Sequence, residues 1–357
     1  MKPEERHLFI EACFRRPVER TPVWMMRQAG RYLPEYRAIR EKYDFITMYK
    51  TPELVAEVTL QPVHRLQVDA AILFSDILVI PEAMGMALEF RERQGPVLLE
   101  PIRQVGQIPS LKPVEPETDL NFVLEGIRLV RRELEGRVPL IGFSGAPWTL
   151  ATYMIEGGAS RNFGHIKRWR FGQPDALHQL LERISDAVVA YCRAQIAAGA
   201  QAIQLFDSWA GILDAAGFEA FALRYVRKII QEIRTPGVPI IYFARGVGAW
   251  LPRLATCGAD VVGLDWQVDL RTARQILGPR MALQGNLDPT ALYAPPPVIR
   301  QLVREMLKRY GAGSGHVANL GHGILPDVPV EHARAFIEAV KTESPVFHNT
   351  SETERLP

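Results

Sequence analysis

The stretch ALHQLLERISDAVVAYCRAQIAAGAQAIQLF, residues 176–206, contains the repeating unit from which the fold of this chain can be predicted. Apolar residues recur at helical spacing through Ala176–Ala198, with polar and charged residues between them. Gly199 follows, as expected of a glycine that ends a helix. The next run, Ala202–Phe206, is apolar at nearly every position, which is typical of a parallel strand covered on both faces.

The same alternation of apolar runs and amphipathic segments extends along the chain. Leu120–Arg137 repeats the helical spacing, and Pro329–Lys341 predicts a last helix with Asp327 placed to cap it. The predicted strands are Pro22–Met26, Ala70–Phe74, Leu140–Phe143, Ala202–Phe206, Pro239–Phe243, Val261–Leu264, Met281–Gln284 and Val317–Leu320. Strand followed by helix, repeated eight times, predicts an α/β fold of the parallel (β/α)8 TIM barrel type.

One long segment, between the second and third predicted strands, departs from a simple barrel. Within it, Ala87–Ile102 alternates around Gln94–Gly95–Pro96, which predicts a β-hairpin inserted after the second strand. Residues 1–342 are therefore expected to form one barrel domain. The polar residues 343–357 are expected to form a C-terminal tail.

Composition narrows the possible partners and the compartment. The 357 residues include 42 basic and 40 acidic side chains, a net charge of +2, so the charge balance favours neither nucleic acid nor an anionic membrane. Cys13, Cys192 and Cys257 are widely spaced and form no disulfide or zinc pattern, which suits a reducing cytoplasm. The start lacks the apolar segment of a secretory signal, and no run approaches the roughly 20 apolar residues that span a bilayer. We expect a cytoplasmic protein.

The active site of a (β/α)8 barrel lies at the C-terminal ends of its strands. Polar residues or glycines follow nearly every predicted strand of this chain: Arg27 and Arg31, Ser75–Asp76, Gly142–Gly157, Asp207 and Ser208, Arg245, Asp265, Gly285–Pro289 and Gly321–Gly323. Two guanidiniums at the end of the first strand indicate a site for an anion with several carboxylates or phosphates. The glycines that flank His322 leave the backbone free to bring its imidazole toward a ligand.

Each of these residues also has a purely structural interpretation. Arg27 and Arg31 could pair at the surface with Glu35 or Asp44. Asp76 could cap a helix that starts near Ile77, Ser208 could be an N-cap, and His322 could make a structural hydrogen bond. Tyr153 lies in an apolar stretch, and from the residues alone a core position is the better interpretation. No H-E-x-x-H motif occurs and the histidines lack ligand spacing, so no metal site is predicted.

The three motifs that most strongly resemble the uroporphyrinogen decarboxylase family are MRQAGRYLPEYR at Met26–Arg37, FSDIL at Phe74–Leu78 and GFSGAPWTLATYMIEG at Gly142–Gly157, of which the first and third are long. Shorter matches are QLFDSWAG at Gln204–Gly211, GLDW at Gly263–Trp266, QGNLDP at Gln284–Pro289 and NLGHGI at Asn319–Ile324. The resemblance implies a carboxy-lyase that converts the four acetates of uroporphyrinogen III to methyl groups, giving coproporphyrinogen III for haem and related tetrapyrroles. It also implies a homodimer that uses neither a metal nor an organic cofactor.

The resemblance assigns roles to six residues. Asp76 would accept hydrogen bonds from the pyrrole N–H groups and stabilise a cationic intermediate. Arg27 and Arg31 would bind carboxylates, and Tyr153, Ser208 and His322 would orient them. Arg27 and His322 join Asp76 as catalytic candidates because of proton transfer, although a guanidinium is a poor acid. The proton donor stays open, with a water held by Arg27 or His322 as one candidate.

Two other functions fit the same barrel. A corrinoid or thiol methyltransferase activates a thiol on zinc through a His-x-Cys pair, but no cysteine of this chain has a histidine two residues before it. A protein that binds an anionic tetrapyrrole without turnover is the second alternative. Asp76 argues against it, because a pure anion binder gains nothing from a buried carboxylate.

Overall fold

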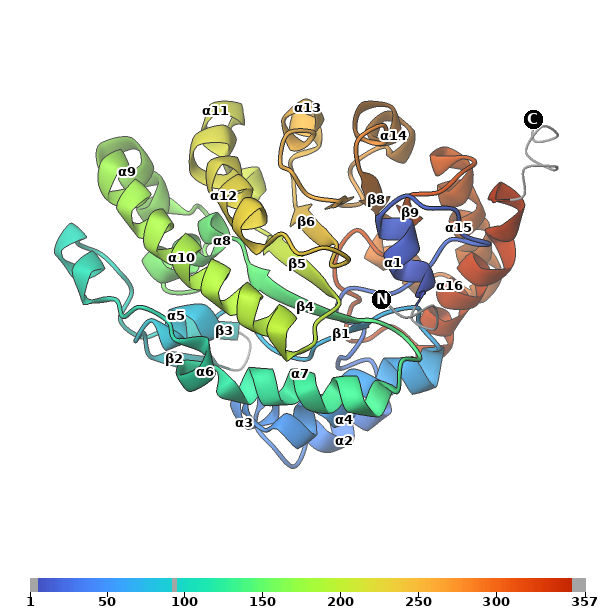
Figure 1. Ribbon diagram of the computed structural model, residues 1–357, viewed down its shortest axis with the longest axis horizontal. Coiled ribbons are helices and arrows are strands. Elements are labelled where there is room, and N and C mark those ends of the chain that lie inside the picture. Colours follow the sequence, from blue (N-terminus) through green and yellow to red (C-terminus); the bar gives the residue numbers. More distant parts are fainter. Residues whose placement is uncertain (1–5, 92–94, 349–357) are drawn as a thin grey trace.

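The computed structural model describes residues 6–91 and 95–348. Its main sheet is parallel and contains seven strands, each paired with the next along the chain. The strands are β1 (Ala71–Ile72), β4 (Leu140–Gly145), β5 (Ala202–Asp207), β6 (Ile240–Ala244), β7 (Val261–Gly263), β8 (Ala282–Gln284) and β9 (His316–Val317). The curled sheet lies inside a ring of helices (Figure 1), which confirms the predicted α/β barrel fold.

Helices follow the strands as the alternation predicted. Their bounds are α1 Leu8–Cys13, α2 Pro34–Arg40, α3 Phe45–Lys50, α4 Pro52–Leu66, α5 Val79–Ala83, α6 Pro116–Asp119, α7 Asn121–Leu134, α8 Pro147–Glu156, α9 Gly164–Gly172, α10 Pro174–Ala198, α11 Ala215–Gly217, α12 Arg224–Ile233, α13 Leu251–Leu254, α14 Leu270–Leu277, α15 Pro296–Tyr310 and α16 Val330–Glu343. Helix α10 ends at Gly199, whose φ of 118° is the left-handed conformation that a glycine adopts readily. Among the described helices, none is long and apolar enough to cross a membrane.

The predicted cap of the last helix is wrong. Helix α16 begins at Val330, its N-cap is Pro329, and no side chain caps it. Asp327 lies too far before the helix to reach the N–H groups of its first turn. It instead accepts a hydrogen bond of 2.6 Å from the Tyr293 hydroxyl.

The predicted first strand, Pro22–Met26, is also wrong, because only Val23 pairs, in an isolated parallel bridge with Ala318. Ala318 N donates to Pro22 O at 2.8 Å, and on the other side Asp69 N donates to Val23 O at 2.8 Å. The segment therefore occupies the eighth position, between β9 and β1. It does not continue as a ladder because side chains take the next N–H groups: Gln28 accepts from Met25 and Asn319 accepts from Met26.

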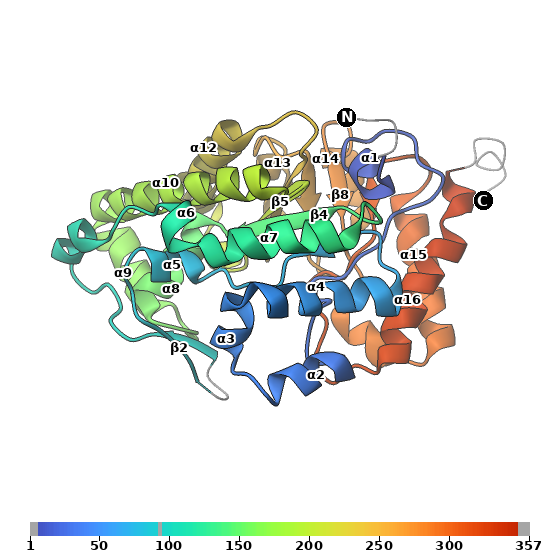
Figure 2. The same ribbon diagram turned by 60° about the horizontal axis from the view of Figure 1, so that its bottom comes forward.

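The stretch for which a hairpin was predicted contains the antiparallel strands β2 (Leu88–Arg91) and β3 (Gly95–Leu98). The pair follows β1, and the predicted turn residue Gln94 lies outside the described residues. The ring of Phe90 on β2 packs against Phe45 on α3, with centroids 4.6 Å apart. Figure 2 shows β2 and α3 side by side on one face of the molecule.

The first residues after α16 pack against the barrel, where a polar tail was expected. The Ser344 hydroxyl accepts a hydrogen bond from Thr21 N at 3.1 Å, and Phe347 O accepts one from Gly313 N at 2.9 Å. Residues 344–348 pack onto the barrel because the Phe347 ring is buried there. The rest of the expected tail, 349–357, lies outside the described residues.

Candidate active site

The candidate site residues lie at one end of the barrel because parallel strands all end on the same side. Arg27 and Arg31 follow the Val23 segment, and Asp76 follows β1. Tyr153 lies on α8, directly after β4. Ser208 follows β5, and His322 lies in the loop after β9. The structure thus brings all six predicted residues to the same end of the sheet.

Arg27 is held at the seam of the barrel by its neighbour Gln28, which sequence reasoning missed. Gln28 is fully buried and its side-chain amide donates to Ala70 O at 2.9 Å, next to β1. The Arg27 backbone has a φ of 62°, which turns its side chain away from the direction of the preceding segment. That side chain lies so close to Gly323 that a Cβ at this position would overlap Arg27 Cδ. Gly323 therefore gives Arg27 the room to lie beside His322.

The surface ion-pair interpretation of the two arginines is wrong. Glu35 pairs with Arg65 at 3.6 Å, and both carboxylate oxygens of Asp44 accept hydrogen bonds from Thr47. Among the described residues, neither Arg27 nor Arg31 has a carboxylate within ion-pair distance, and both are exposed. Their guanidiniums remain available to an anionic ligand.

Asp76 combines a local structural role with a free oxygen. Its Oδ1 accepts a hydrogen bond of 2.8 Å from Leu78 N, but α5 begins at Val79 and has no side-chain cap, so the helix-cap interpretation is wrong. Its Oδ2 accepts no hydrogen bond from the described part of the chain. Burial raises the pKa of Asp76, while the Leu78 N–H and the nearby Arg27 act in the opposite direction.

Tyr153 and Ser208 are not placed as their structural interpretations predicted. Tyr153 is only partly buried, whereas the residues on either side, Thr152 and Met154, are fully buried. Burial raises the pKa of Tyr153, and the charges of Asp76 and Arg27 also act on its hydroxyl. Ser208 is not an N-cap, because the short helix Ala210–Ile212 after it has no side-chain cap.

His322 lies between aromatic rings and is flanked by positive charge. Its ring centroid is 6.1 Å from that of Phe243 and 6.5 Å from that of Trp266. Burial, followed by Arg27 and Arg245, lowers the pKa of His322 to about 3. Within the described residues its imidazole makes no hydrogen bond, so the structural alternative fails. A neutral imidazole can donate one hydrogen bond to a ligand carboxylate.

Sequence reasoning noted Asp207 before Ser208 but missed its structural role. Its carboxylate is fully buried and accepts hydrogen bonds from Thr149 at 2.6 Å and from Tyr242 at 2.8 Å. Thr149 in turn accepts from Trp209 N at 3.2 Å. Burial raises the pKa of Asp207 to about 6. This network joins α8, the end of β5 and β6, and so fixes the backbone on both sides of Ser208.

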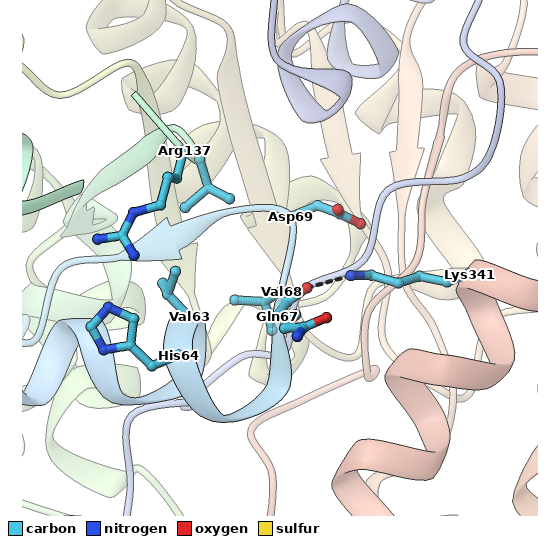
Figure 3. A pocket seen from close by; sticks show the side chains of 8 residues that line it. Val63, His64, Gln67, Val68, Asp69, Arg137 and Lys341 are labelled. Carbon is cyan, nitrogen blue, oxygen red and sulfur yellow. Dashed lines mark hydrogen bonds between the residues drawn. The ribbon is translucent and has the colours of Figure 1, made fainter. Parts of the chain in front are cut away.

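A cavity of about 470 Å³ lies at the opposite end of the barrel (Figure 3). Its lining residues are Val63, His64, Gln67, Val68, Asp69, Arg137, Val138 and Lys341. Asp69 and Val138 precede β1 and β4, which places this cavity at the N-terminal ends of the strands. Lys341 donates to Gln67 O at 2.5 Å across its mouth. The cavity is therefore separate from the candidate site.

The cysteines and the acidic residues do not form a metal site in the described part of the chain. No group of three or more His, Cys, Asp or Glu side chains is close enough there to hold an ion. Cys13, Cys192 and Cys257 are all buried as free thiols. Burial raises the pKa of each thiol, to about 11 for Cys257, which disfavours the thiolate form that binds metals.

Comparison with known proteins finds relatives that match nearly the whole chain. The family model described as uroporphyrinogen decarboxylase (URO-D) matches residues 4–343. A protein of Methylococcus capsulatus named uroporphyrinogen decarboxylase is 54% identical over 96% of this chain and 99% of its own length. One of Hahella chejuensis with the same name is 52% identical over 96% of this chain and 98% of its own. A solved methyltransferase from Methanosarcina mazei has a TM-score of 0.80 at 22% identity, covering 94% of this chain and 97% of its own, and shares the fold.

The buried carboxyl of Asp207 leads to a prediction about stability and pH. A folded-state pKa of about 6, against an ordinary value of about 4, means that folding favours the protonated form by roughly 3 kcal/mol at most. This contribution is present below about pH 4 and is lost as pH rises to about 6. Asp207→Asn keeps a neutral side chain at every pH, so its free energy of unfolding should lack this decline. Urea unfolding from pH 4 to 8 measures both proteins.

Asp186→Asn is the control for that series, because Asp186 has a side-chain exposure of 66% and pairs only with Lys228. It should retain the pH dependence of the original protein. An Asp207→Asn profile parallel to the original between pH 4 and 6 would contradict the assignment.

Proposed function

The chain belongs to the uroporphyrinogen decarboxylase family, and we propose that it converts the four acetate side chains of uroporphyrinogen III to methyl groups, giving coproporphyrinogen III. It is a carboxy-lyase of tetrapyrrole biosynthesis. The observation that carries this proposal is the agreement along the whole length with relatives that are more than half identical and bear this name. The fold alone does not carry it, because one barrel serves many activities.

The chemistry defines what the site must supply. An acetate on a pyrrole loses CO₂ only if the electrons left behind are stabilised. Protonation of the ring α-carbon makes the ring cationic, and this cation accepts the electron pair as the carbon–carbon bond breaks. The methylene carbon then gains a proton to become methyl, and the ring α-carbon loses the proton it had taken up, which restores the neutral pyrrole. The protein therefore has to stabilise a positive charge on the ring while it binds several negative carboxylates around it.

Asp76 is proposed to stabilise the ring cation. One of its oxygens is held by Leu78 N, which fixes the orientation of the carboxylate. The other oxygen can accept the pyrrole N–H groups that point to the centre of the macrocycle. A fixed carboxylate in a partly buried position stabilises a developing cation more strongly than the same group in water, because it needs no reorganisation.

Arg27 and Arg31 are proposed to bind substrate carboxylates through paired N–H donors. Tyr153, Ser208 and the neutral imidazole of His322 supply single hydrogen bonds that orient the remaining arms. A guanidinium is a poor acid near neutral pH, so we assign the ring proton to a water held by Arg27 or His322. The reaction as proposed needs neither a metal nor an organic cofactor, since the protonated ring itself accepts the electrons.

We also propose that the enzyme acts in the cytoplasm and as a homodimer. Three free and buried cysteines are compatible with a reducing compartment. The dimer follows from the family resemblance, and sedimentation of the purified chain would establish it.

Two alternative functions are less well supported. The methyltransferase shares the barrel but is only 22% identical, and the buried thiols of this chain are poor zinc ligands. A binding protein without turnover would have no use for the partly buried Asp76.

The proposal is tested by an anaerobic assay of the purified protein with uroporphyrinogen III, with and without a chelator. The products are oxidised and separated by their number of carboxylates. We expect a series from eight carboxylates down to four, with the same rate in the presence of the chelator. Untouched substrate beside an active control enzyme would refute the proposed activity.

Asp76→Asn should separate binding from turnover. The amide keeps the shape and one acceptor but removes the negative charge, so kcat should fall by about two to three orders of magnitude while KM changes far less. Asp269→Asn is a matched control, because Asp269 also accepts a backbone hydrogen bond of 2.8 Å, at the exposed start of α14. Steady-state measurement of kcat and KM in both variants tests this expectation. Unchanged kcat in Asp76→Asn would remove this residue from the mechanism.

Gly323→Ala should weaken substrate binding, and its only effect should be to displace the Arg27 side chain. The added methyl group overlaps Arg27 Cδ, so the arginine has to change its rotamer and leave His322. We expect KM to rise about tenfold to a hundredfold, as for the loss of a charge-assisted hydrogen bond. Gly106→Ala, where no atom lies within 4 Å of the added Cβ, is the control. In an Arg27→Ala background, Gly323→Ala should have no additional effect, and a full additional loss would show that it acts elsewhere.

A further inference from the structure

We infer that Arg245 binds a carboxylate of the substrate and forms, with Arg27, a pair of guanidiniums near His322. This inference rests on the proposed function and adds a binding residue to it. Arg245 directly follows β6, and none of the motifs that carry the family resemblance includes it.

The loops around His322 place both arginines near its imidazole. The Arg27 side chain fills the space beside Gly323. Gly321 lies against the backbone of Trp266, where a Cβ would overlap the Trp266 nitrogen. The guanidinium carbon of Arg245 lies 5.3 Å from the centroid of the Trp266 ring. Gly323 thus admits the Arg27 side chain, and Gly321 admits the backbone of Trp266, whose ring lies near Arg245.

The backbone of Arg245 is fixed by three neighbouring segments. Its N donates to Asp207 O at 3.2 Å, and the next N–H, of Gly246, donates to Asp265 Oδ2 at 2.5 Å. Its carbonyl oxygen lies 2.7 Å from where a Cβ of Gly211 would be, so this close approach requires glycine. A binding residue whose backbone is held in this way loses little conformational entropy when its ligand binds.

Within residues 6–91 and 95–348, the guanidinium of Arg245 has no anionic partner. Asp265 is nearby, but its two oxygens accept the N–H groups of Gly246 and Gln267. Across the described residues, Arg245 forms no ion pair, and it is only partly buried. The guanidinium carbon lies 5.3 Å from the Trp266 ring centroid, a cation–π contact that leaves the N–H donors available for bidentate binding of a carboxylate.

The charge of the site points to the same class of ligand. Arg27 and Arg245 both act on the imidazole of His322, and with burial as the main cause its pKa lies well below the ordinary value. Two cations near one neutral imidazole, neither of them in an ion pair with a carboxylate of the described residues, favour the binding of a ligand with several carboxylates. The acetate and propionate arms of the tetrapyrrole meet this requirement, because neighbouring arms can reach different arginines.

Arg245→Gln and Arg245→Lys test the inference, with Arg309→Gln on the exposed surface of α15 as the control. We expect KM for uroporphyrinogen III to rise about tenfold to a hundredfold in Arg245→Gln, with a smaller change in kcat. Arg245→Lys should recover part of the loss, because the ammonium keeps the charge but not the paired donors. Arg309→Gln should leave both constants unchanged. A KM within twofold of the original in Arg245→Gln would overturn the inference.

A binding measurement separates this inference from the proposed function. Quenching of protein fluorescence by oxidised coproporphyrin, a tetracarboxylate, gives a Kd without any turnover. Weaker binding in Arg245→Gln would support the arginine as a carboxylate site even if the original protein proved inactive. Unchanged Kd and KM beside normal turnover in the original protein would refute Arg245 alone. Thermal unfolding of each variant shows whether it is folded, and Arg245→Lys replaces Arg245→Gln in the comparison if the latter is not.

Discussion

The structure depends on the closure of the sheet by the segment around Val23, which lies between β9 and β1. Asp69 holds this closure through two hydrogen bonds of 2.7 Å from Arg20 and one of 2.8 Å from Val23 N. With side-chain exposures of 11% and 21%, Asp69 and Arg20 form a largely buried pair, so loss of either partner would leave an uncompensated charge. Because the same segment continues into Arg27, barrel closure and the position of a guanidinium proposed to bind the substrate depend on the same contacts.

The charge of the site depends on which carboxylates near the strand ends already accept hydrogen bonds from the protein. Near the strand ends, Asp207 and Asp265 are buried and their oxygens are occupied by protein donors. They shape the backbone but neutralise neither Arg27 nor Arg245. Asp76 differs, because one of its oxygens remains free for a ligand. In the proposed mode of binding, several cations contact the carboxylate arms and one carboxylate contacts the centre of the ligand, which matches a polyanionic ring that becomes cationic during the reaction.

Sequence periodicity predicted the fold because seven of the eight apolar runs are real strands, and the order of strands places their following residues at one end. The Val23 segment could not be distinguished from a strand, since it is equally apolar, and only the side chains of Gln28 and Asn319 end its pairing. The position of Arg245 after a strand was visible in the sequence. The sequence could not show that Arg245 forms no ion pair in the described part of the chain. That outcome depends on Asp265, whose two carboxylate oxygens both accept backbone N–H groups.

The network around Asp207 shows how a buried group can influence residues that contact the ligand. Thr149 and Tyr153 are four residues apart on α8, so they lie on the same face of that helix. The bond from Thr149 to Asp207 fixes this face relative to the end of β5, where Ser208 begins the loop. The bond from Tyr242 to Asp207 adds β6, which continues into Arg245. One carboxyl group therefore sets the relative positions of three residues proposed to bind carboxylate arms, and its burial keeps water from competing for the bonds that do so.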